Sequence, residues 1–440
     1  MSAHDAERMA GLLEREGYAP TDSEAGADLV VINTCSVRER AEEKLFTRLG
    51  ELEATRTADQ PRQVVAVTGC VAQQEGERIR RRSHVVDVVV GTQALRQLPE
   101  LAARAASRPN SRKPLVDVHP YEDVSFPLGS VRRGDPVKAY VTIIEGCNDF
   151  CSYCVVPYTR GHERMRPAAD ILAEVGEAVA SGRREVHLLG QIVNHYQAPD
   201  QPGCGFADLV RQVAEVDGLL RLRFASPHPR HVSQDLIRAY AEVPQIARHL
   251  HLPVQSGSTR VLETMRRRHT REEYLALVDR VRAAVPDVAL STDMIVGFPG
   301  ETAEDFEQTL SLVARVRFHS MFSFKYSPRP NTLARKRYAD DVSEVEKARR
   351  IVALQDLQRE IQRDIFDRLV GTTVEVLVDG PSRRRPDELA GRTSQNTVVN
   401  FAGEPAWVGR LAHVLVERAG PNSLAGRVVD VEAGVPAHAG

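Results

Sequence analysis

Three cysteines lie close together in the segment that runs from Glu145 to Cys154. Cys147, Cys151 and Cys154 follow a CxxxCxxC spacing directly after a predicted strand, which brings three thiolates onto one loop. Structural zinc sites are almost always closed by four ligands, so three thiolates fit zinc poorly unless a fourth ligand comes from elsewhere. A 4Fe–4S cluster can instead take three cysteines and leave one iron open. The spacing predicts such a cluster, with a structural zinc loop as the alternative.

Two further cysteines follow short apolar strands near the start of the chain. Cys35 comes just after a predicted strand at 29–32, and Cys70 just after one at 64–67. That edge of an open parallel sheet is where ligands usually bind. Six cysteines in 440 residues are too few for a disulfide scaffold, so we expect these two to bind metal or to take part in chemistry. Cys204 lies on a loop of a later segment and is expected to be an incidental thiol.

Four polar side chains beside predicted strand ends are candidates for a pocket. Gln255 and Asp293 are candidates because the chemistry of parallel barrels gathers at the C-terminal ends of the strands. His228 and His251 stand in similar positions. Each of these two histidines either hydrogen-bonds within the fold or lines the pocket, and both interpretations stay open.

The elements that must position these residues fall into three predicted domains. Residues 1–106 alternate apolar strands with helical stretches, which predicts a small parallel α/β domain. A Pro-, Ser- and Arg-rich stretch indicates a linker, which we place at 107–135. Residues 136–368 show about six strand–helix units and a long charged exit helix, which suits a complete or partial parallel barrel. Short strands separated by Gly, Pro and Asn predict a small β-barrel at 369–435.

Charge and hydropathy limit the classes of function. The formal net charge of -2 excludes a uniformly basic protein that wraps nucleic acid, although a local basic face can still bind RNA. Arg383, Arg384 and Arg385 are the favoured phosphate contacts, because they join two predicted strands of the C-terminal barrel. The N-terminus lacks the apolar core of a secretory signal, and no run approaches membrane-spanning length. We therefore expect a cytoplasmic protein without a membrane partner.

The loop from Glu145 to Cys154 closely resembles the cluster loop of the radical S-adenosylmethionine (SAM) superfamily. The resemblance implies that SAM chelates the open iron through its amino and carboxylate groups. Electron transfer from the reduced cluster then releases a 5'-deoxyadenosyl radical, which can abstract hydrogen from an unactivated C–H bond. It also implies a catalytic role for Cys147, Cys151 and Cys154. Tyr153, in the aromatic slot before the last cysteine, is implied to pack near the adenine of SAM.

Motifs along nearly the whole chain are similar to those of the radical SAM methylthiotransferases. These motifs lie at 33–39, 69–73, 158–161, 226–229, 251–257, 293–301 and 326–330. Within that group, NTCSVRE at 33–39, YSPRP at 326–330 and the C-terminal Gly391-Arg-Thr393 and Asn400-Phe401 most resemble the MiaB-type tRNA enzymes.

The resemblance implies an N-terminal methylthiotransferase domain, a partial TIM-type radical SAM barrel and a C-terminal TRAM domain that grips tRNA. The implied reaction adds a methylthio group to C2 of N6-isopentenyladenosine, the base immediately 3' of the anticodon. One SAM would supply the methyl group and another the radical. SAM and two 4Fe–4S clusters are the implied cofactors, and Cys35 and Cys70 would hold the second cluster, which serves in sulfur delivery. The implied partners are the isopentenylated tRNA and an electron donor such as flavodoxin or ferredoxin, and we expect a monomer.

The chain departs from this family at the second cluster. The family uses three cysteines there, the first in a Gly-Cys-Gln-Met-Asn motif, whereas only Cys35 and Cys70 are present here. The residues from Met1 to Met9 resemble the family sequence that begins at the Met of that motif. We therefore expect a misassigned or truncated start. The rival interpretation is a variant whose second cluster is weak or absent.

Two other functions compete with this interpretation. One is a related methylthiotransferase that modifies threonylcarbamoyl adenosine or an aspartate of a ribosomal protein. The other is a tRNA-binding variant with a defective sulfur-donor cluster. The MiaB-like motifs argue against the first, and the intact CxxxCxxC spacing argues against a chain that only binds RNA.

Overall fold

The computed structural model of the chain describes residues 1–35, 39–55, 63–108, 113–119 and 131–432. Its contacts divide the chain into two compact units. The N-terminal unit comprises Met1–Gly134, Ile144–Asn148 and Cys154–Arg166, and the C-terminal unit comprises Asp135–Ile143, Asp149–Tyr153 and Pro167–Gly440. The cysteine loop therefore contributes residues to both units.

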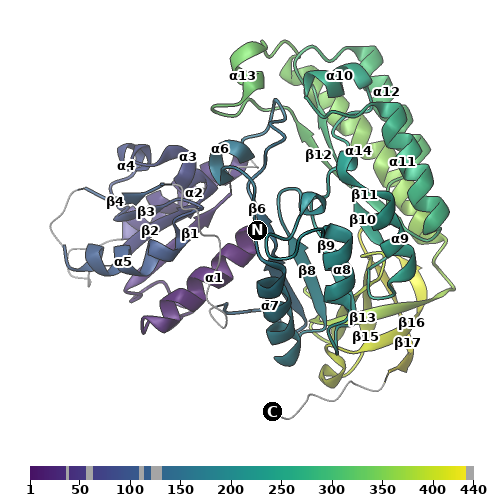
Figure 1. Ribbon diagram of the computed structural model, residues 1–440, viewed down its shortest axis with the longest axis horizontal. Helices are drawn as coiled ribbons and strands as arrows, with labels where there is room; N and C mark the ends of the chain where they lie inside the picture. Colours follow the sequence, from purple (N-terminus) through teal and green to yellow (C-terminus); the bar gives the residue numbers. More distant parts are fainter. Residues whose placement is uncertain (36–38, 56–62, 109–112, 120–130, 433–440) are drawn as a thin grey trace. The chain divides into compact units, whose positions relative to one another are not determined.

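The N-terminal unit is built on a parallel sheet in the order β1-β2-β3-β4 (Figure 1). The strands are β1 (Leu29–Thr34), β2 (Val64–Gly69), β3 (Val88–Val90) and β4 (Leu115–Asp117). The helices are α1 (Ser2–Arg15), α2 (Glu39–Thr55), α3 (Cys70–Glu75), α4 (Arg78–Arg82), α5 (Leu98–Ala106) and α6 (Val156–Arg160). A short hairpin-like pair, β6 (Ile144–Glu145) and β7 (Arg164–Met165), flanks the cysteine loop.

Both faces of this sheet are buried. Successive residues of a strand point to opposite faces. Val65 and Val67 of β2 pack in one core with α2, whereas Val64 and Ala66 pack in a second core with α1 and α5. A parallel sheet covered by helices on both faces is the α/β arrangement that the near-continuous apolar runs predict.

The segment 107–135, expected to be a linker, contains part of this sheet. Its residues Leu115–Asp117 form β4, which pairs in parallel with β3. Three residues between Pro- and Arg-rich flanks are too short for an apolar period to stand out, which explains why the sequence pattern does not indicate this strand. Residues 109–112 and 120–130 of the expected linker lie outside the described residues.

The C-terminal unit contains six parallel strands with helices outside them. Three form the sheet β5-β8-β9 and three form the sheet β10-β11-β12. An isolated parallel bridge pairs Leu222 of β9 with Ile246, which comes shortly before β10. The strands are β5 (Lys138–Thr142), β8 (Glu185–Leu189), β9 (Arg221–Phe224), β10 (His249–His251), β11 (Ala289–Val296) and β12 (Ser320–Lys325). The helices are α7 (Ala168–Ala180), α8 (Phe206–Ala214), α9 (Gln234–Glu242), α10 (Thr259–Thr264), α11 (Arg271–Ala284), α12 (Ala303–Val316) and α13 (Leu333–Arg337). The partial parallel barrel predicted from the sequence is confirmed.

Local sequence signals fix where the outer helices begin. Thr270 accepts from the backbone N–H of Glu273 and Glu273 accepts in return, which starts α11 with a capping box. Thr302 and Asp305 start α12 in the same way. Each box satisfies two backbone donors that a helix start would otherwise leave unpaired.

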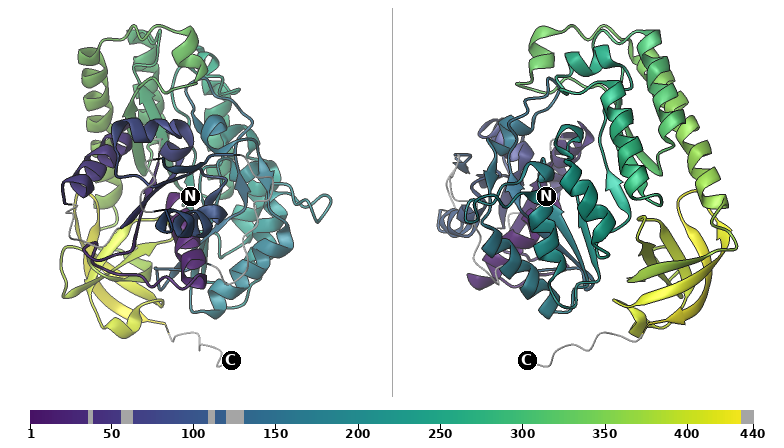
Figure 2. Two further views of the ribbon diagram at one scale, coloured as in Figure 1. Left: turned by 90° about the vertical axis from the view of Figure 1, so that its left-hand side faces the viewer. Right: turned by 45° about the vertical axis from the view of Figure 1, so that its right-hand side comes forward.

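The chain ends in a closed five-stranded barrel. Helix α14 (Glu344–Asp367) runs from the large barrel to this small one, which is drawn in yellow in Figure 2. The strand order is β13-β14-β15-β17-β16. The strands are β13 (Thr373–Pro381), β14 (Glu388–Thr393), β15 (Val398–Ala402), β16 (Leu411–Ala419) and β17 (Leu424–Val431). The sequence pattern does not indicate β14, but the small β-barrel that it predicts is confirmed.

Polar side chains join the small barrel to the N-terminal ends of the large barrel's strands. Arg221, at the start of β9, donates to the carbonyl of Arg392 at 2.7 Å, and Arg223 donates to the carbonyl of Thr393 at 2.9 Å. Lys138, at the start of β5, forms a 2.7 Å ion pair with Asp379. The small barrel is thereby fixed at the end of the strands that is opposite to their C-terminal ends.

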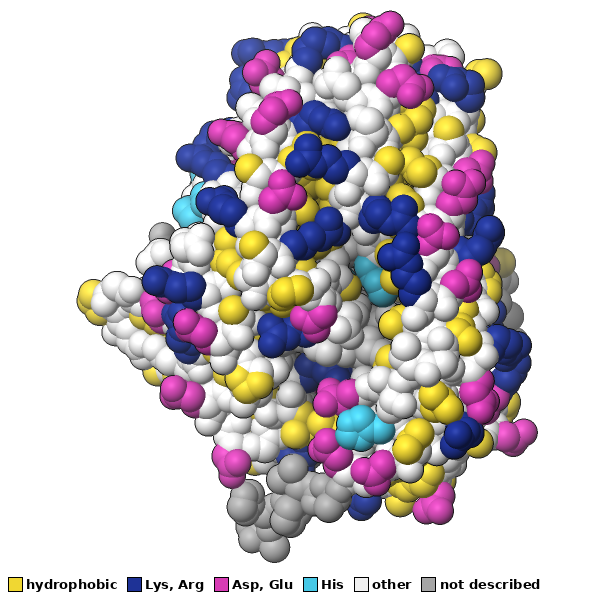
Figure 3. Space-filling model, turned by 90° about the vertical axis from the view of Figure 1, so that its right-hand side faces the viewer, with side chains coloured by type: hydrophobic (Ala, Val, Ile, Leu, Met, Phe, Trp, Pro, Cys, Tyr) yellow, Lys and Arg dark blue, Asp and Glu magenta, His cyan; other side chains and the backbone are white. Residues whose placement is uncertain are grey.

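The charge of the surface is mixed. Figure 3 shows one face of the molecule, on which Lys and Arg side chains are interspersed with Asp and Glu. This agrees with a formal net charge close to zero. Within the described residues, no helix has both the length and the apolar character needed to cross a membrane.

Candidate active site

The cysteine loop starts at a close backbone approach within the N-terminal unit. Gly146 has a φ of +81°, and a Cβ atom there would lie 2.0 Å from the carbonyl oxygen of His162. Only glycine meets both conditions without strain. The backbone N–H of Cys147 then donates to the carbonyl of Gly161 at 3.1 Å, and Cys147 is 8% exposed. The first cysteine therefore has a fixed and shielded position.

Cys151 lies on the part of the loop that belongs to the C-terminal unit. The neighbouring Ser152 donates through its backbone N–H to the carbonyl of Met265 and through its Oγ to the carbonyl of Thr264. A guanidinium nitrogen of Arg267 lies 3.5 Å from the Sγ of Cys151. The turn that follows α10 thus holds the middle of the loop, and Cys151 is 9% exposed.

Tyr153 packs against a small apolar cluster of the C-terminal unit. The cluster consists of Val261, Met265, Phe298, Tyr326 and Ala334, with Ile295 and Tyr338 beside it. The phenol ring of Tyr153 is only partly buried there. Its contact with the adenine of SAM stays a prediction.

The three cysteines of the loop are a donor set that fits a 4Fe–4S cluster. Cys147 and Cys151 are buried, Cys154 is half-buried, and none of the six cysteines forms a disulfide. Arg267 donates toward the sulfur of Cys151, and cysteine sulfurs are the ligands of such clusters. Cys147, Cys151 and Cys154 could therefore hold a cluster with one iron left for another ligand.

Three of the four predicted pocket residues meet in the C-terminal unit. The backbone N–H of Gln255 donates to the carbonyl of Asp293 at 2.9 Å. The Oδ1 of Asp293 lies 3.5 Å from the Nε2 of His251. Gln255 has a φ of +78°, a left-handed conformation that is unfavourable for a non-glycine residue and is often found at ligand sites. Gln255, Asp293 and His251 could therefore line a common pocket.

His228 is held by a separate set of contacts. The Oδ1 of Asn194 accepts from the backbone N–H of His228 at 2.8 Å, and the Nδ2 of Asn194 donates to the carbonyl of His228 at 2.9 Å. The Nδ1 of His228 accepts from the backbone N–H of Arg230 at 3.1 Å. The proton of the neutral ring therefore sits on Nε2, which lies 3.7 Å from the Oδ2 of Asp149 in the cysteine loop.

This tautomer decides what His228 can do. Asp149, His228 and His231 stand close enough to suggest a metal site. Burial, together with the charge of Arg267, lowers the pKa of His228, so the ring stays neutral. Because Nδ1 already accepts a hydrogen bond, Nε2 is the protonated nitrogen and offers no lone pair to a metal. His228 is instead an N–H donor directed at the carboxylate of Asp149.

Cys35 and Cys70 lie at neighbouring strand ends of the N-terminal unit. Thr34 of β1 pairs in register with Gly69 of β2, and each cysteine follows one member of that pair. The Oγ1 of Thr34 donates to the carbonyl of Thr68 at 2.7 Å, which fastens the two strand ends together. The structure therefore places both thiols at one edge of the sheet, as the sequence predicts.

A buried positive charge lies near this edge. Arg160, in α6, pairs with Asp5 of α1 in a buried contact. Burial alone would lower the pKa of Arg160, but the charges of Asp5 and Cys70 raise it above its ordinary value. The backbone of the same helix end is held by Thr92 and Gln93, which donate to the carbonyls of Thr159 and Arg160.

Cys204 belongs to the C-terminal unit. Its thiol contacts the carbonyl of Gly205 and the amide of Gln212. Burial raises the pKa of the Cys204 thiol, so it is poorly suited to act as a thiolate ligand. These contacts fit the packing role expected for an isolated cysteine.

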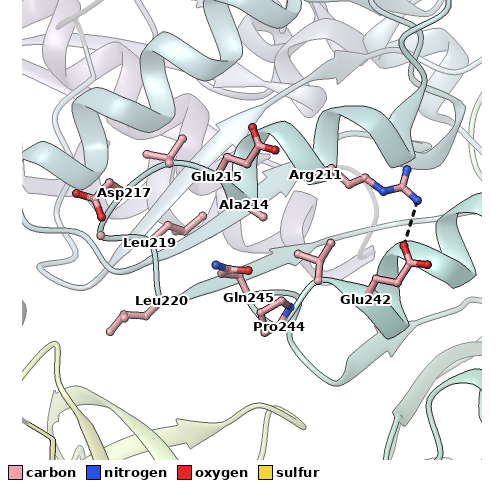
Figure 4. A pocket seen from close by; sticks show the side chains of 12 residues that line it. Arg211, Ala214, Glu215, Asp217, Leu219, Leu220, Glu242, Pro244 and Gln245 are labelled. Carbon is pink, nitrogen blue, oxygen red and sulfur yellow. Dashed lines mark ion pairs between the residues drawn. The ribbon is translucent and has the colours of Figure 1, made fainter.

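A surface hollow of about 660 Å³ lies away from these residues. It is lined by the end of α8, the loop before β9 and the residues 242–245, and Arg211 faces Glu242 across it (Figure 4). The loop before β9 lies at the N-terminal end of that strand, and residues 242–245 come before the N-terminal end of β10. Chemistry in parallel barrels occurs at the opposite end, so this hollow is not the candidate site.

Sequence reasoning did not identify Asp149, Asn194 or Arg267. Asp149 stands inside the CxxxCxxC spacing, which was the available signal for it. Arg267 lies in a run of three arginines that reads as solvated surface, and only the structure shows that the middle one is buried. Asn194 carries no signal, because its role is to hold the backbone of a residue that is distant in the sequence.

Comparison with known proteins agrees with this geometry. The Radical SAM superfamily model matches residues 141–313, the model of the uncharacterized protein family UPF0004 matches residues 1–91, and the TRAM domain model matches residues 367–429. The chain is 45% identical over 435 residues to the tRNA-2-methylthio-N(6)-dimethylallyladenosine synthase of Escherichia coli O139:H28 (strain E24377A / ETEC), covering 98% of this chain and 91% of the relative. The synthase of Escherichia fergusonii (strain ATCC 35469) matches with the same values.

The chain belongs to the tRNA-2-methylthio-N(6)-dimethylallyladenosine synthase family. The cofactors of this family are SAM and two 4Fe–4S clusters. Cys147, Cys151 and Cys154 could hold one cluster, and Cys35 and Cys70 could offer two thiols to the other.

Solved structures show the fold that this synthase family shares with more distant enzymes. The radical SAM methyltransferase TsrM from Kitasatospora setae aligns with a TM-score of 0.55 at 16% identity, over 76% of this chain and 71% of that one. The radical SAM enzyme OxsB aligns with a TM-score of 0.51 at 12% identity, over 82% of this chain and 53% of that one. The similarity supports the radical SAM fold of the synthase.

The basic loop of the synthase's TRAM domain lies where the sequence places it. Arg383, Arg384 and Arg385 join β13 to β14 and are exposed. Arg385 forms a 2.7 Å ion pair with Glu388. A surface pair of this kind costs little to break, so the side chain remains able to contact a phosphate.

Proposed function

We propose that this chain is a radical SAM tRNA methylthiotransferase that adds a methylthio group to C2 of N6-isopentenyladenosine next to the anticodon. The observation that carries the proposal is the match of 98% of the chain to synthases that are named for this modification. The CxxxCxxC loop, in which Cys147 and Cys151 are buried, supports the radical half of the reaction. The TRAM match at residues 367–429 supports binding of tRNA.

We assign Cys147, Cys151 and Cys154 as the ligands of the radical SAM cluster. When bound, the cluster supplies the electron that cleaves SAM. The chain's part is to exclude water from the thiolates and to hold the loop, through the contacts of Cys147 with Gly161 and of Ser152 with Met265. A fixed loop lowers the reorganisation that accompanies electron transfer and positions SAM for the reaction.

The residues around Gln255 form the proposed SAM and substrate pocket. Asp293 lies within β11 and Gln255 follows the end of β10, and they offer a carboxylate and an amide to the polar groups of SAM. The Nε2 of His251 lies 3.5 Å from the Oδ1 of Asp293, and Tyr153 offers an aromatic face for the adenine. These assignments follow the rule that parallel barrels bind ligands at the C-terminal ends of their strands.

We assign Cys35 and Cys70 to the second cluster, which serves in sulfur delivery. Two thiolates leave two irons of a cubane without a protein ligand from these residues. Insertion of sulfur is therefore the step most sensitive to the exact sequence of the N-terminal unit.

The remaining expectations concern partners and organisation. A flavodoxin or ferredoxin is the proposed electron donor, and the chain is proposed to act as a monomer in the cytoplasm. We propose domain limits of 1–106, 136–368 and 369–435, with β4 as an addition to the sheet of the first domain. The methylthiotransferases that act on threonylcarbamoyl adenosine or on a ribosomal protein are disfavoured by the names of the relatives.

The test is anaerobic reconstitution of the 440-residue chain, followed by an iron count and by assays on isopentenylated tRNA. About eight irons with methylthiolated product support both cluster assignments. About four irons with SAM cleavage alone would support the radical site and contradict the assignment of Cys35 and Cys70. Absence of SAM cleavage in a chain that holds iron would contradict the proposal as a whole.

A further inference from the structure

A buried arginine, Arg267, lies beside the cysteine loop. Arg267 is 6% exposed, and no carboxylate among the described residues forms an ion pair with it. One terminal nitrogen donates to the carbonyl of Pro253 at 2.7 Å, and the other lies 3.5 Å from the Sγ of Cys151. Its Nε has no hydrogen-bond partner within the described part of the chain. A buried guanidinium is costly unless negative charge compensates it.

The residues on both sides of Arg267 have a strained backbone conformation. Arg266 has a φ of +59° and Arg268 a φ of +55°, so left-handed residues stand on both sides of Arg267. Side chains other than glycine rarely adopt this conformation, and such strain persists where the surrounding structure fixes it, most often at functional sites. Arg266 and Arg268 are exposed, whereas Arg267 between them is buried.

The guanidinium keeps its charge in this position. Burial by itself would lower the pKa of Arg267, but Tyr153 and the thiol of Cys151 raise it above its ordinary value. Asp149, in the cysteine loop, acts in the same direction with a smaller effect. Tyr153, Cys151 and Asp149, which favour the charged form of Arg267, lie on the loop that carries the cluster ligands.

We propose that Arg267 sets the reduction potential of the cluster held by Cys147, Cys151 and Cys154, by directing a positive charge and an N–H at the sulfur of Cys151. The inference rests on the proposed ligation of that cluster. Reduction adds one electron, so the reduced cluster is more negative than the oxidised one. A fixed cation and an N–H···S hydrogen bond stabilise the reduced form more, and both raise the reduction potential. Arg267 thereby makes the cluster easier for a protein electron donor to reduce.

The test is an EPR-monitored redox titration of the reconstituted chain and of two neutral variants. Arg267→Met removes both the charge and the donor, and Arg267→Gln keeps an N–H that can still reach a carbonyl. We expect both variants to shift the midpoint potential to more negative values, with the larger shift for Met. A midpoint potential equal to that of the wild type in either variant that holds about four irons at this site would overturn the inference.

Neighbouring arginines provide the matched control. Arg266→Met and Arg268→Met remove the same charge from exposed positions next to the site. Water and salt screen these charges, so we expect the midpoint potential to stay at the wild-type value. A shift of equal size in the controls would mean that any nearby charge acts in this way, and it would contradict a specific role for Arg267.

A measurement on the wild-type chain covers the case in which neutral variants lose the cluster. We would label the arginines with 15N and record the hyperfine spectrum of the reduced cluster. A guanidinium nitrogen 3.5 Å from a ligand sulfur is expected to give a 15N coupling, and Arg267→Lys is expected to remove it. Absence of this coupling in the wild type overturns the inference. Absence of the cluster itself, by iron count, would instead contradict the proposed ligation.

Discussion

The carboxylate of Asp5 lies 2.5 Å from a guanidinium nitrogen of Arg160, and both side chains are buried in the N-terminal unit. A second buried pair joins Arg8 to Glu145 at 3.1 Å. Asp5 and Arg8 stand on α1, whereas their partners stand on the two segments of this unit that flank the cysteine loop. Helix α1 therefore fastens both of these segments by charge.

Removal of one partner is expected to destabilise this unit. We predict that Asp5→Ala lowers the free energy of unfolding by about 3–5 kcal/mol, because it leaves the charge of Arg160 buried and unpaired. Denaturant titration measures this effect, with the exposed Glu43→Gln as a control that is expected to stay within about 0.5 kcal/mol. Burial would raise the pKa of Asp5, but Arg160 holds it below 3.8. The stabilisation is thus complete above pH 3.8 and is lost as the pH falls below it.

Substitutions in the two sets of cysteines are expected to abolish different activities. Replacing any one of Cys147, Cys151 and Cys154 by Ala should remove about four irons and abolish SAM cleavage. Replacing Cys35 or Cys70 by Ala should leave SAM cleavage intact and abolish methylthiolation. Iron analysis and a 5'-deoxyadenosine assay measure both outcomes.

Cys204→Ala is the control for the cysteine variants, because the thiol of Cys204 contacts Gly205 and Gln212 in its own loop and the helix that follows. It should retain the iron content and both activities. Loss of iron in this variant would show that Cys204 is a ligand and would contradict its assignment as a packing residue.

The loop between β13 and β14 is expected to contribute to tRNA affinity. Replacing Arg383, Arg384 and Arg385 with Ala should weaken binding and flatten its dependence on salt, by about 0.9 in the logarithmic slope for each duplex phosphate that the loop no longer neutralises. Binding assays at several salt concentrations measure the slope. The exposed pair Arg78 and Arg81, replaced with Ala, serves as the control. An unchanged slope in the triple variant would rule out phosphate binding at this loop.

His319 is expected to make the contact between the two barrels sensitive to acid. Its Nε2 lies 2.8 Å from the Oγ1 of Thr397, and burial lowers the pKa of His319 to about 4. The unfolded chain binds a proton near pH 6.5, so it takes up more protons than the folded chain between pH 6.5 and 4. Stability should therefore fall with pH across this window, by up to about 3 kcal/mol at complete protonation.

The variant that tests this prediction is His319→Gln, which keeps a hydrogen-bonding group and cannot titrate. Its unfolding free energy should depend less on pH between 6.5 and 4 than that of the wild type. His84→Gln, at an exposed position, should retain the wild-type dependence. Equal curves for the wild type and His319→Gln would exclude this histidine as the cause.

Long periodic elements of this fold can be predicted from the sequence, and short ones cannot. The apolar runs at 29–32 and 64–67 lie within two residues of the observed bounds of β1 and β2. β10 has only three residues and carries two histidines, so no apolar period marks it. β14 contains Gly391 and Arg392, which weaken its strand signal, yet closure of the barrel supplies its pairing on both edges.

The candidate site likewise contains residues that local sequence spacing predicts and residues that depend on tertiary contacts. Cys147, Cys151 and Cys154 can be found because their spacing itself carries the chemistry. Arg267 cannot be found in this way, because its burial depends on left-handed backbone conformations at Arg266 and Arg268. Arginine at these positions does not indicate such a conformation. The partnership of His228 with Asn194 depends on contacts across 34 positions of the chain, which only the folded structure brings together.

The attachment of the small barrel has a consequence for the shape of the RNA that can react. Arg221, Arg223 and Lys138 fix this barrel at the N-terminal ends of the strands, whereas Gln255 stands beyond their C-terminal ends. A strand of five or six residues measures about 17–20 Å. The small barrel and the pocket at Gln255 are therefore separated by at least the height of the large barrel. A free nucleoside cannot reach from one to the other, but a folded stem with its loop can. The enzyme would therefore select RNA by the distance that its stem and loop span, and shortening the anticodon stem should reduce modification even when the target base is unchanged.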